Sequence, residues 1–471
     1  MDKERAFTLI ELLVVIAGLN NFFMKNIFLI AFGILIFQIS TAQDASNTRY
    51  MNQPWKMHHI DRQFWNHNSL SPGDVDKDGL VDYLVIHEGA DKVTILFNPG
   101  VGSQLYHEWE KVVISDGNNI EYGYFGDLNG DGNLDAVYAN GDKADVNIIW
   151  GPDKSQVKDP SKWVDAGPIP SSKNQGHYVY LETYDINQDG ALDIVTGGRR
   201  HISGKLNGLI WFEAPKNKND REDLTKWEMH SIDANLLSGH GFVIEDLNKD
   251  GHVDIVVANP DWDTPDHEDM LLWYQNPGPH SEAIENPWKK HVVFKNQQLF
   301  AKPQVGIGDL NDDGKTDLVV QTDNYVFYLE QQENTDDWKV NQINKPEITR
   351  WVTRPTKVVD IDGNGKLDIV GMTIHNYGYT PFGKASVFWM EYLGDKPGTD
   401  NWETHVIKWS DGIFSGRAFR GEKWDHMRFI DLDGDGDLDI IANCEEYYER
   451  IKGKQNTLLG VVWFENPTIN P

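Results

Sequence analysis

The stretch DLNGDGNLD, residues Asp127–Asp135, decides the fold of this chain because it is one copy of a nonapeptide that recurs seven times. The shared pattern is D-x-[DN]-x-[DN]-G-x-x-D. The other copies are DVDKDGLVD from Asp74, DINQDGALD from Asp185, DLNKDGHVD from Asp246, DLNDDGKTD from Asp309, DIDGNGKLD from Asp360 and DLDGDGDLD from Asp431. Consecutive copies begin 53, 58, 61, 63, 51 and 71 residues apart. This spacing indicates one supersecondary unit per copy.

Each copy of the motif is flanked by short runs that are typical of strands. FVIED (Phe242–Asp246) leads into the fourth copy and DIVVAN (Asp254–Asn259) continues from it. An aromatic run such as LLWYQNP from Leu271 and a Trp-led run such as WKKHVV from Trp288 follow. Short runs rich in β-formers, separated by Gly, Pro, Asn and Asp, predict four strands per copy. The expected fold is therefore all-β, a single seven-bladed β-propeller with four-stranded blades over residues 43–471.

The distribution of the Trp-led run predicts how the ring closes. No such run follows the seventh copy, but WKMHHI from Trp55 precedes the first copy. We therefore expect the N-terminal strand to pair with the C-terminal blade as its outermost strand. This pairing would close the ring and remove exposed sheet edges.

Residues 1–42 are interpreted as a leader region. From Met24 the chain has a basic residue, Lys25, an apolar run over Ile27–Phe37 and a small-residue cleavage site at Ser40–Ala42. This order is typical of a secretory signal peptide, and it predicts a secreted or periplasmic protein. An earlier apolar run, AFTLIELLVVIAG, is similar to a prepilin leader, and we interpret Met24 as the true start. A membrane anchor is the alternative.

Composition limits the partners of this chain. Its 471 residues carry 73 acids and 43 bases, a formal charge of −30. Such an excess of acids argues against nucleic acid as a partner, and no membrane partner is expected after signal cleavage. The single cysteine, Cys444, excludes an internal disulfide and a cysteine-based zinc site. We expect a monomer.

The seven loops predict structural calcium sites, up to seven in number. Calcium takes several oxygen ligands at flexible geometry, and carboxylates at motif positions 1, 3, 5 and 9 can surround one ion. Gly at position 6 permits the sharp turn. The expected ligands are Asp74, Asp76, Asp78, Asp82, Asp127, Asn129, Asp131, Asp135, Asp185, Asn187, Asp189, Asp193, Asp246, Asn248, Asp250, Asp254, Asp309, Asn311, Asp313, Asp317, Asp360, Asp362, Asn364, Asp368, Asp431, Asp433, Asp435 and Asp439. Loops that turn without metal are the alternative.

These loops and their flanks resemble the FG-GAP/VCBS repeats of the integrin α-subunit propeller and of many secreted bacterial proteins. The resemblance implies calcium ligands at the motif positions, although Asn364 stands where most repeats here have Asp. Relatives in this family include adhesion modules, lectins, rhamnogalacturonan lyases and the fungal aldos-2-ulose dehydratase. The WFENP and W-x-x-H-x-I flanks are most similar to secreted bacterial proteins of the dehydratase-like branch.

A ring of polar residues is expected on the face opposite the calcium loops, where segments enter the first strand of each blade. It includes Asn68, and its candidate catalytic residues are His177, His240, Lys302, Arg354, Asp425 and His426. The candidate substrate-binding residues are Glu121, Arg199, Arg200, Trp262, Trp351, His375, Tyr377, Arg420 and Trp424. Aromatic side chains suit sugar rings, arginines suit carboxylates, and histidines suit proton transfer or an additional divalent metal. Solvated or structural roles are the alternative for each residue.

The repeats differ on this face and agree on the calcium face, which favours one composite site. The sequence therefore favours a carbohydrate lyase or dehydratase with a histidine base and with Arg354 and Lys302 stabilising an enolate-like charge. Three alternatives stay open: a glycoside hydrolase using Asp425 and Glu121, a glycan-binding lectin or adhesin, and a structural calcium-dependent interaction module.

Overall fold

The computed structural model describes residues 49–117, 120–141, 144–199, 208–259, 269–279, 281, 284–295, 305–350, 353–373, 383–410, 422–446 and 459–468. The expected leader, residues 1–42, lies outside this part. The described residues form 29 strands and several short 3-10 turns, with no α-helix among them. No helix in these residues has the length and apolar character needed to cross a membrane.

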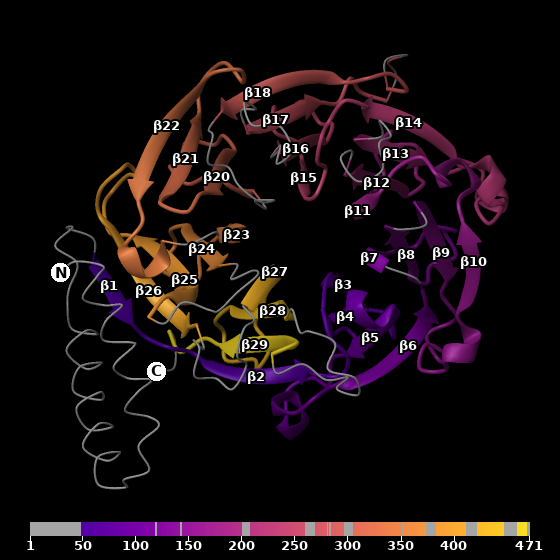
Figure 1. Cartoon of the computed structure of the whole chain (residues 1–471), viewed down its shortest axis with the longest axis horizontal. Coiled ribbons are helices and arrows are strands. Elements are labelled where there is room, and N and C mark those ends of the chain that lie inside the picture. Colours follow the sequence, from indigo (N-terminus) through magenta and orange to yellow (C-terminus); the bar gives the residue numbers. More distant parts are fainter. Residues whose placement is uncertain are drawn as a thin grey trace, which may run out of the picture. The chain divides into compact units, whose positions relative to one another are not determined.

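Seven sheets form a ring, each built on four antiparallel strands, with the first strand of each blade nearest the centre of the ring (Figure 1). Blades 1 to 4 are β3 (Ser71–Gly73), β4 (Asp82–His87), β5 (Lys92–Phe97), β6 (Glu110–Asp116); β7 (Ile120–Gly126), β8 (Asp135–Asn140), β9 (Asp145–Trp150), β10 (Val164–Pro168); β11 (Tyr178–Tyr184), β12 (Asp193–Gly198), β13 (Leu209–Glu213), β14 (Glu228–Asp233); and β15 (Phe242–Glu245), β16 (Asp254–Asn259), β17 (Met270–Gln275), β18 (Lys289–Lys295). Blades 5 to 7 are β19 (Gly306–Gly308), β20 (Asp317–Gln321), β21 (Tyr325–Gln331), β22 (Trp338–Asn344); β23 (Thr353–Val359), β24 (Asp368–Thr373), β25 (Ala385–Tyr392), β26 (Trp402–Trp409); and β27 (Glu422–Ile430), β28 (Asp439–Glu446), β29 (Val461–Glu465) with β2 (Lys56–Asp61). The predicted fold is confirmed.

The ring closes as the sequence predicts. Strand β2 pairs antiparallel with β29, in a register that runs from Lys56 opposite Glu465 to Asp61 opposite Val461. The N-terminal strand is therefore the outermost strand of the C-terminal blade. A further strand, β1 (Arg49–Asn52), pairs in parallel with β26 and makes blade 6 five-stranded. The sequence analysis did not anticipate this strand, so the N-terminal segment joins two blades rather than one.

The W-x-x-H-x-I flanks form a repeated contact within blades. The ring of a histidine on the fourth strand packs against the ring of the buried tryptophan on the third strand. The four pairs are His58 with Trp463 at 4.4 Å, His230 with Trp211 at 4.7 Å, His291 with Trp273 at 4.1 Å and His405 with Trp389 at 3.9 Å between ring centroids. Each such histidine shields one face of a core aromatic side chain and leaves its ring nitrogens for polar partners, such as Glu465 at 2.6 Å from His58.

One buried lysine, Lys345, lowers the stability of the folded protein at low pH. Lys345, which follows β22, is fully buried, and its Nζ donates to the carbonyl oxygen of Thr322 at 3.1 Å. Burial lowers its pKa to about 7, against the opposing effect of nearby Asp323. Below pH 7 the folded protein must hold a buried ammonium group. From pH 7 to about 10.5 the unfolded chain binds a proton that the folded chain lacks, so stability rises with pH in this window.

We therefore expect Lys345→Met to raise the Tm by about a few degrees at pH 6, and by less at pH 9.5. Calorimetric melting at the two pH values measures this difference. The exposed Lys339 provides a matched control, since Lys339→Met should have the same small effect at both pH values. An effect of Lys345→Met that did not depend on pH would contradict the prediction.

Candidate functional site

The motif loops lie between the first and second strands of their blades, for example residues 127–134 between β7 and β8. Since every blade is an antiparallel meander, all seven loops are at one face of the ring. The segments that enter the first strands and those that leave the second strands are at the other face. We call the face with the motif loops the loop face and the opposite face the entry face. The two faces therefore carry different kinds of site.

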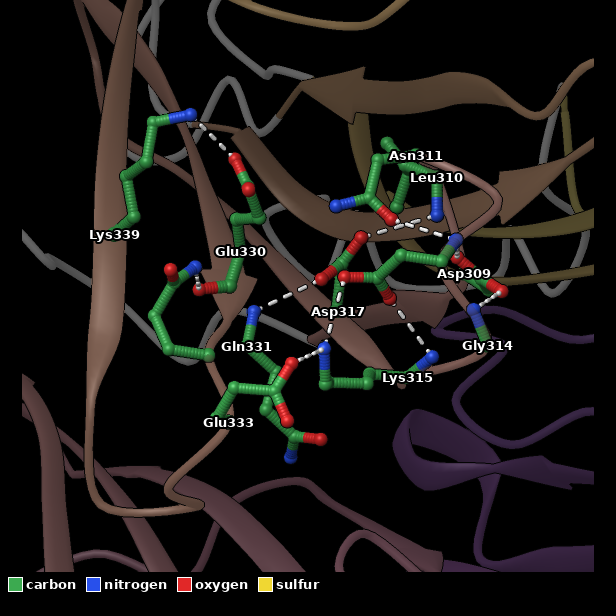
Figure 2. A network of polar contacts seen from close by, with 12 residues as sticks. Asp309, Leu310, Asn311, Gly314, Lys315, Asp317, Glu330, Gln331, Glu333 and Lys339 are labelled. Carbon is green, nitrogen blue, oxygen red and sulfur yellow. Dashed lines mark hydrogen bonds and ion pairs between the residues drawn. The ribbon is translucent and has the colours of Figure 1, made fainter.

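The fifth loop shows how the motif folds (Figure 2). The carboxylate of Asp309 accepts the backbone N–H of Asp313 at 3.0 Å and that of Gly314 at 2.7 Å. Gly314 has a φ of +84°, which requires glycine, and Asp312 at position 4 is also left-handed at +57°. The aspartate at position 1 thus holds the turn, as its counterparts do in other loops.

The aspartate at position 9 ties the loop to the blade. Asp317 is buried, and its Oδ2 accepts the N–H of Leu310 at 3.1 Å while its Oδ1 accepts that of Gln331 at the end of β21 at 2.9 Å. The same pair of bonds occurs at Asp82, Asp135, Asp193 and Asp439. One carboxylate therefore joins the loop to the end of the third strand.

Several carboxylate oxygens in the loops lack a hydrogen-bond partner although they are buried. They are Asp76 Oδ1, Asp127 Oδ1, Asp254 Oδ2 and Asp368 Oδ1. Carboxylate oxygens of Asp74, Asp76 and Asp78 lie within 4.8 Å of one another, as do those of Asp360, Asp362 and Asp368. A buried oxygen without a donor, beside other carboxylates, is the arrangement that a hard divalent cation satisfies. The loops therefore fit such an ion.

The acid–base properties of the position 9 aspartates agree with this fit. Burial, reinforced by neighbouring carboxylates, raises the pKa of Asp82, Asp254 and Asp439 to about 7 and that of Asp368 to about 8. Without a cation the loops thus disfavour their own ionised form.

In the fifth loop, a lysine of the motif contacts one of the motif carboxylates. Lys315 Nζ lies 3.3 Å from Asp313 Oδ2 and 3.1 Å from Glu333 Oε1 (Figure 2). The lysine occupies position 7 of the motif and partly neutralises a carboxylate that was expected to bind calcium. The fifth loop should therefore bind a metal ion more weakly than a loop whose carboxylates lack such a contact.

On the entry face, blades 7, 1, 2 and 3 contribute to one polar cluster. We call it the Glu88 cluster, and it comprises Asn68, Glu88, Glu121, His177, Arg199, Lys423, Asp425 and Glu445. His177 Nε2 lies 3.2 Å from Glu121 Oε1, and both side chains are nearly buried. Asn68 Nδ2 donates to Glu88 Oε2 at 3.5 Å. These contacts bring together residues that are far apart in the sequence.

A buried lysine lies between two acids of this cluster. Lys423 Nζ is 3.6 Å from Asp425 Oδ2 and forms an ion pair with Glu445. Four carboxylates thus face two basic side chains, those of Lys423 and Arg199. Burial raises the pKa of Glu88 to about 7, and the charges of Glu121 and Asp425 act in the same direction. Such an excess of carboxylates favours one protonated acid within the cluster.

Close packing holds the His177–Glu121 pair in place. A Cβ atom added at Gly141 would lie 2.6 Å from His177 Cε1 and 2.9 Å from Glu121 Cγ. The loop after β8 therefore approaches the pair at a distance that only glycine allows. This contact orients the imidazole and the carboxylate toward each other.

The structure brings together four of the predicted entry-face site residues, namely Glu121, His177, Arg199 and Asp425. His426 lies against Tyr122, at 5.1 Å between ring centroids, and against Tyr180, at 6.2 Å. His240 is partly exposed before β15 of blade 4. Arg200, Trp262, Lys302, Trp351, His375, Tyr377 and Arg420 lie outside the described residues, as does the side chain of Arg354.

Trp424 requires a correction. The sequence analysis placed it at the surface to stack on a sugar ring, but its side chain is fully buried against Phe464, and its Nε1 donates to Glu422 Oε2 at 3.1 Å. A register shift in the pairing of β27 with β28, between Trp424 and His426, interrupts the regular alternation of side chains. Trp424 is thus a core residue.

Sequence reasoning missed Glu88, and it did not select Glu445. Glu88 directly follows the second strand of blade 1, the same position that the predicted site residue Arg199 holds in blade 3. This position in the blade was the sequence feature from which Glu88 could have been predicted as a site residue.

Comparison with known families finds the FG-GAP-like repeat at residues 74–138, 127–196 and 309–371. The chain therefore carries FG-GAP-like repeats within a seven-bladed β-propeller. No curated protein matches the sequence. Among solved structures, an Agrocybe aegerita lectin that recognises non-reducing terminal N-acetylglucosamine is 15% identical, with 85% of this chain and 95% of that chain covered and a TM-score of 0.42. BBS1N in complex with ARL6DN, soaked with lead, is 11% identical, with coverages of 88% and 98% and a TM-score of 0.45.

Proposed function

We propose that the protein is a secreted, calcium-stabilised propeller that acts on carbohydrate as a carbon–oxygen lyase or dehydratase, with the Glu88 cluster as its active site. The convergence of acids, cations and a histidine from four blades carries this proposal. Buried clusters in which acidic and basic side chains are unequal in number, as they are here, are typical of functional sites. The repeats agree on the loop face, so the divergent entry face provides a single site.

The cluster contains the groups that an elimination requires. His177, oriented by Glu121, would take the proton from the carbon next to a carbonyl or carboxylate group. The electron pair of that C–H bond forms the C=C bond as the C–O bond breaks, and Glu88 would give its proton to the leaving oxygen. Lys423 and Arg199 would stabilise the negative charge that develops on the substrate.

Calcium in the motif loops is the second part of the proposal. The orphaned buried oxygens of Asp76, Asp127, Asp254 and Asp368 support it. The bound ions would offset repulsion among carboxylates and fix the loop face of each blade. Export to a calcium-rich environment follows from the signal peptide that the sequence predicts.

Removal of calcium should lower the Tm. We expect a chelator to reduce it by about 5 °C or more at pH 7.5, because the loop carboxylates then repel one another without compensation. Differential scanning calorimetry with EDTA, followed by excess calcium, measures the loss and its recovery. Magnesium serves as a control, since its smaller octahedral shell should restore less of the Tm. An unchanged Tm on chelation would show that the loops turn without metal.

Variants of the Glu88 cluster should separate catalysis from folding. We expect Glu88→Gln and His177→Asn each to lower kcat by about 10²- to 10⁴-fold with little change in Tm. Glu110→Gln, on the outer strand β6, should keep full activity. The assay incubates calcium-loaded protein with plant and algal polysaccharides and sugar ketoses and identifies products by mass spectrometry.

The mass of the product decides among the alternatives. Elimination gives a product lighter than the hydrolytic one by one water molecule. A product that has gained water would instead indicate a hydrolase, and retention on a glycan without turnover would indicate a lectin. Full activity of both variants would remove the Glu88 cluster from the mechanism.

A further inference from the structure

A second cluster of potential ligands lies where the ring closes. Asp61 ends β2, His67 lies in the segment that leads into blade 1, and His87 ends β4. All three residues have a relative exposure of 0%. Asp61 Oδ2 is 3.2 Å from His67 Nε2 and 3.7 Å from His87 Nε2, and the three ligand atoms lie within 4.8 Å of one another.

Three of the four ring nitrogens of these two buried histidines lack a hydrogen-bond partner among the described residues, and the fourth, His67 Nε2, bonds Asp61 Oδ2. Neither ring nitrogen of His87 has a partner among the described residues, and neither has Nδ1 of His67. The separation of 3.7 Å between His87 and Asp61 is too long for a hydrogen bond. Burial of a polar group without a partner destabilises the folded state. The Nε2 atom of His87 lies near the carboxylate of Asp61 and the ring of His67 but bonds to neither. This arrangement therefore indicates that an additional group lies between the three side chains.

The distances suit a tetrahedral metal ion. Zinc bonds of about 2.0–2.1 Å place neighbouring ligand atoms roughly 3.3–3.4 Å apart. The two separations from Asp61 Oδ2, 3.2 and 3.7 Å, lie on either side of that value. Two imidazole nitrogens and one carboxylate oxygen favour zinc over calcium, which prefers oxygen ligands alone.

Outer contacts hold the carboxylate in position for such an ion. Asp61 Oδ1 accepts the N–H of Gln63 at 2.9 Å and forms an ion pair with Lys111. Oδ2 thus remains directed at the two histidines. Phe64 and Asn66, in the connecting segment, have positive φ values of 69° and 54°. Non-glycine residues adopt this conformation rarely, and it is found where surrounding contacts enforce it.

We propose that Asp61, His67 and His87 bind one Zn²⁺ ion as a structural site that joins the closing strand to blade 1. Asp61 belongs to the outermost strand of blade 7, and the carbonyl oxygen of His67 accepts a bond from Asn443 Nδ2 of β28 at 2.7 Å. His87 belongs to blade 1. The ion would therefore link the first and last blades, and it would use none of the histidines that the sequence analysis considered for a second metal.

The test measures zinc in the full mature chain with the loops saturated by calcium. Mass spectrometry of the metal content after dialysis against Zn²⁺ should give one tightly bound zinc per chain, and Zn²⁺ should raise the Tm by about a few degrees. His87→Asn should lose both effects, while His107→Ala, an exposed histidine, should keep them. Wild-type protein without this zinc, or equal zinc in His87→Asn, would overturn the proposal.

Two further measurements do not depend on the folding of His87→Asn. Co²⁺ bound to wild-type protein should show the intense visible absorption of a tetrahedral site, and a weak octahedral spectrum would refute the assignment. Lys111→Met should bind Zn²⁺ more tightly than wild-type protein, because it removes a positive charge that repels the ion while the N–H of Gln63 still holds Asp61 Oδ1. Weaker binding by Lys111→Met would contradict the proposed ligand set.

Discussion

The scaffold depends on the buried aspartate at position 9 of each motif. In five blades this carboxylate accepts one N–H from its own loop and one from the end of the third strand, so it joins three strands at one end of the sheet. In the other two blades, Asp254 and Asp368 make one of the two bonds and leave an oxygen without a donor. Buried carboxylates of this kind require either their hydrogen bonds or a cation.

This requirement explains why the two faces differ in sequence. Every blade must satisfy the same carboxylate on the loop face, so the motif repeats there. The entry face has no such shared requirement, and different blades contribute different side chains to it. The Glu88 cluster takes Glu88 from blade 1 and Lys423 and Asp425 from blade 7, so it spans the point where the ring closes. The approach of blade 7 to blade 1 therefore forms part of the candidate active site as well as closing the ring.

Local pattern predicted the repeated parts of this structure. The blades, the loops and the pairing of β2 follow from motif spacing and from the match of WKMHHI to the other Trp-led runs. Strand β1 was not predicted because RYMN carries no such pattern, and it is held by the edge of β26. Glu88 and the Asp61–His67–His87 group were missed because their importance arises from burial and from neighbours on other blades. Trp424 was misplaced because a register shift in β27 is not visible in the sequence.

The most direct test of the account compares two aspartates of the third loop. Asp193, at position 9, accepts the N–H groups of Ile186 and Ala214. The carboxylate of the half-buried Asp189 accepts the N–H of Ala191 within the loop, a bond that asparagine can also accept. In EDTA, urea unfolding of Asp193→Asn should show a loss of about 1–3 kcal/mol in the free energy of unfolding, and Asp189→Asn a loss below about 0.5 kcal/mol. Equal losses, or none at Asp193, would contradict the central role of the position 9 carboxylate.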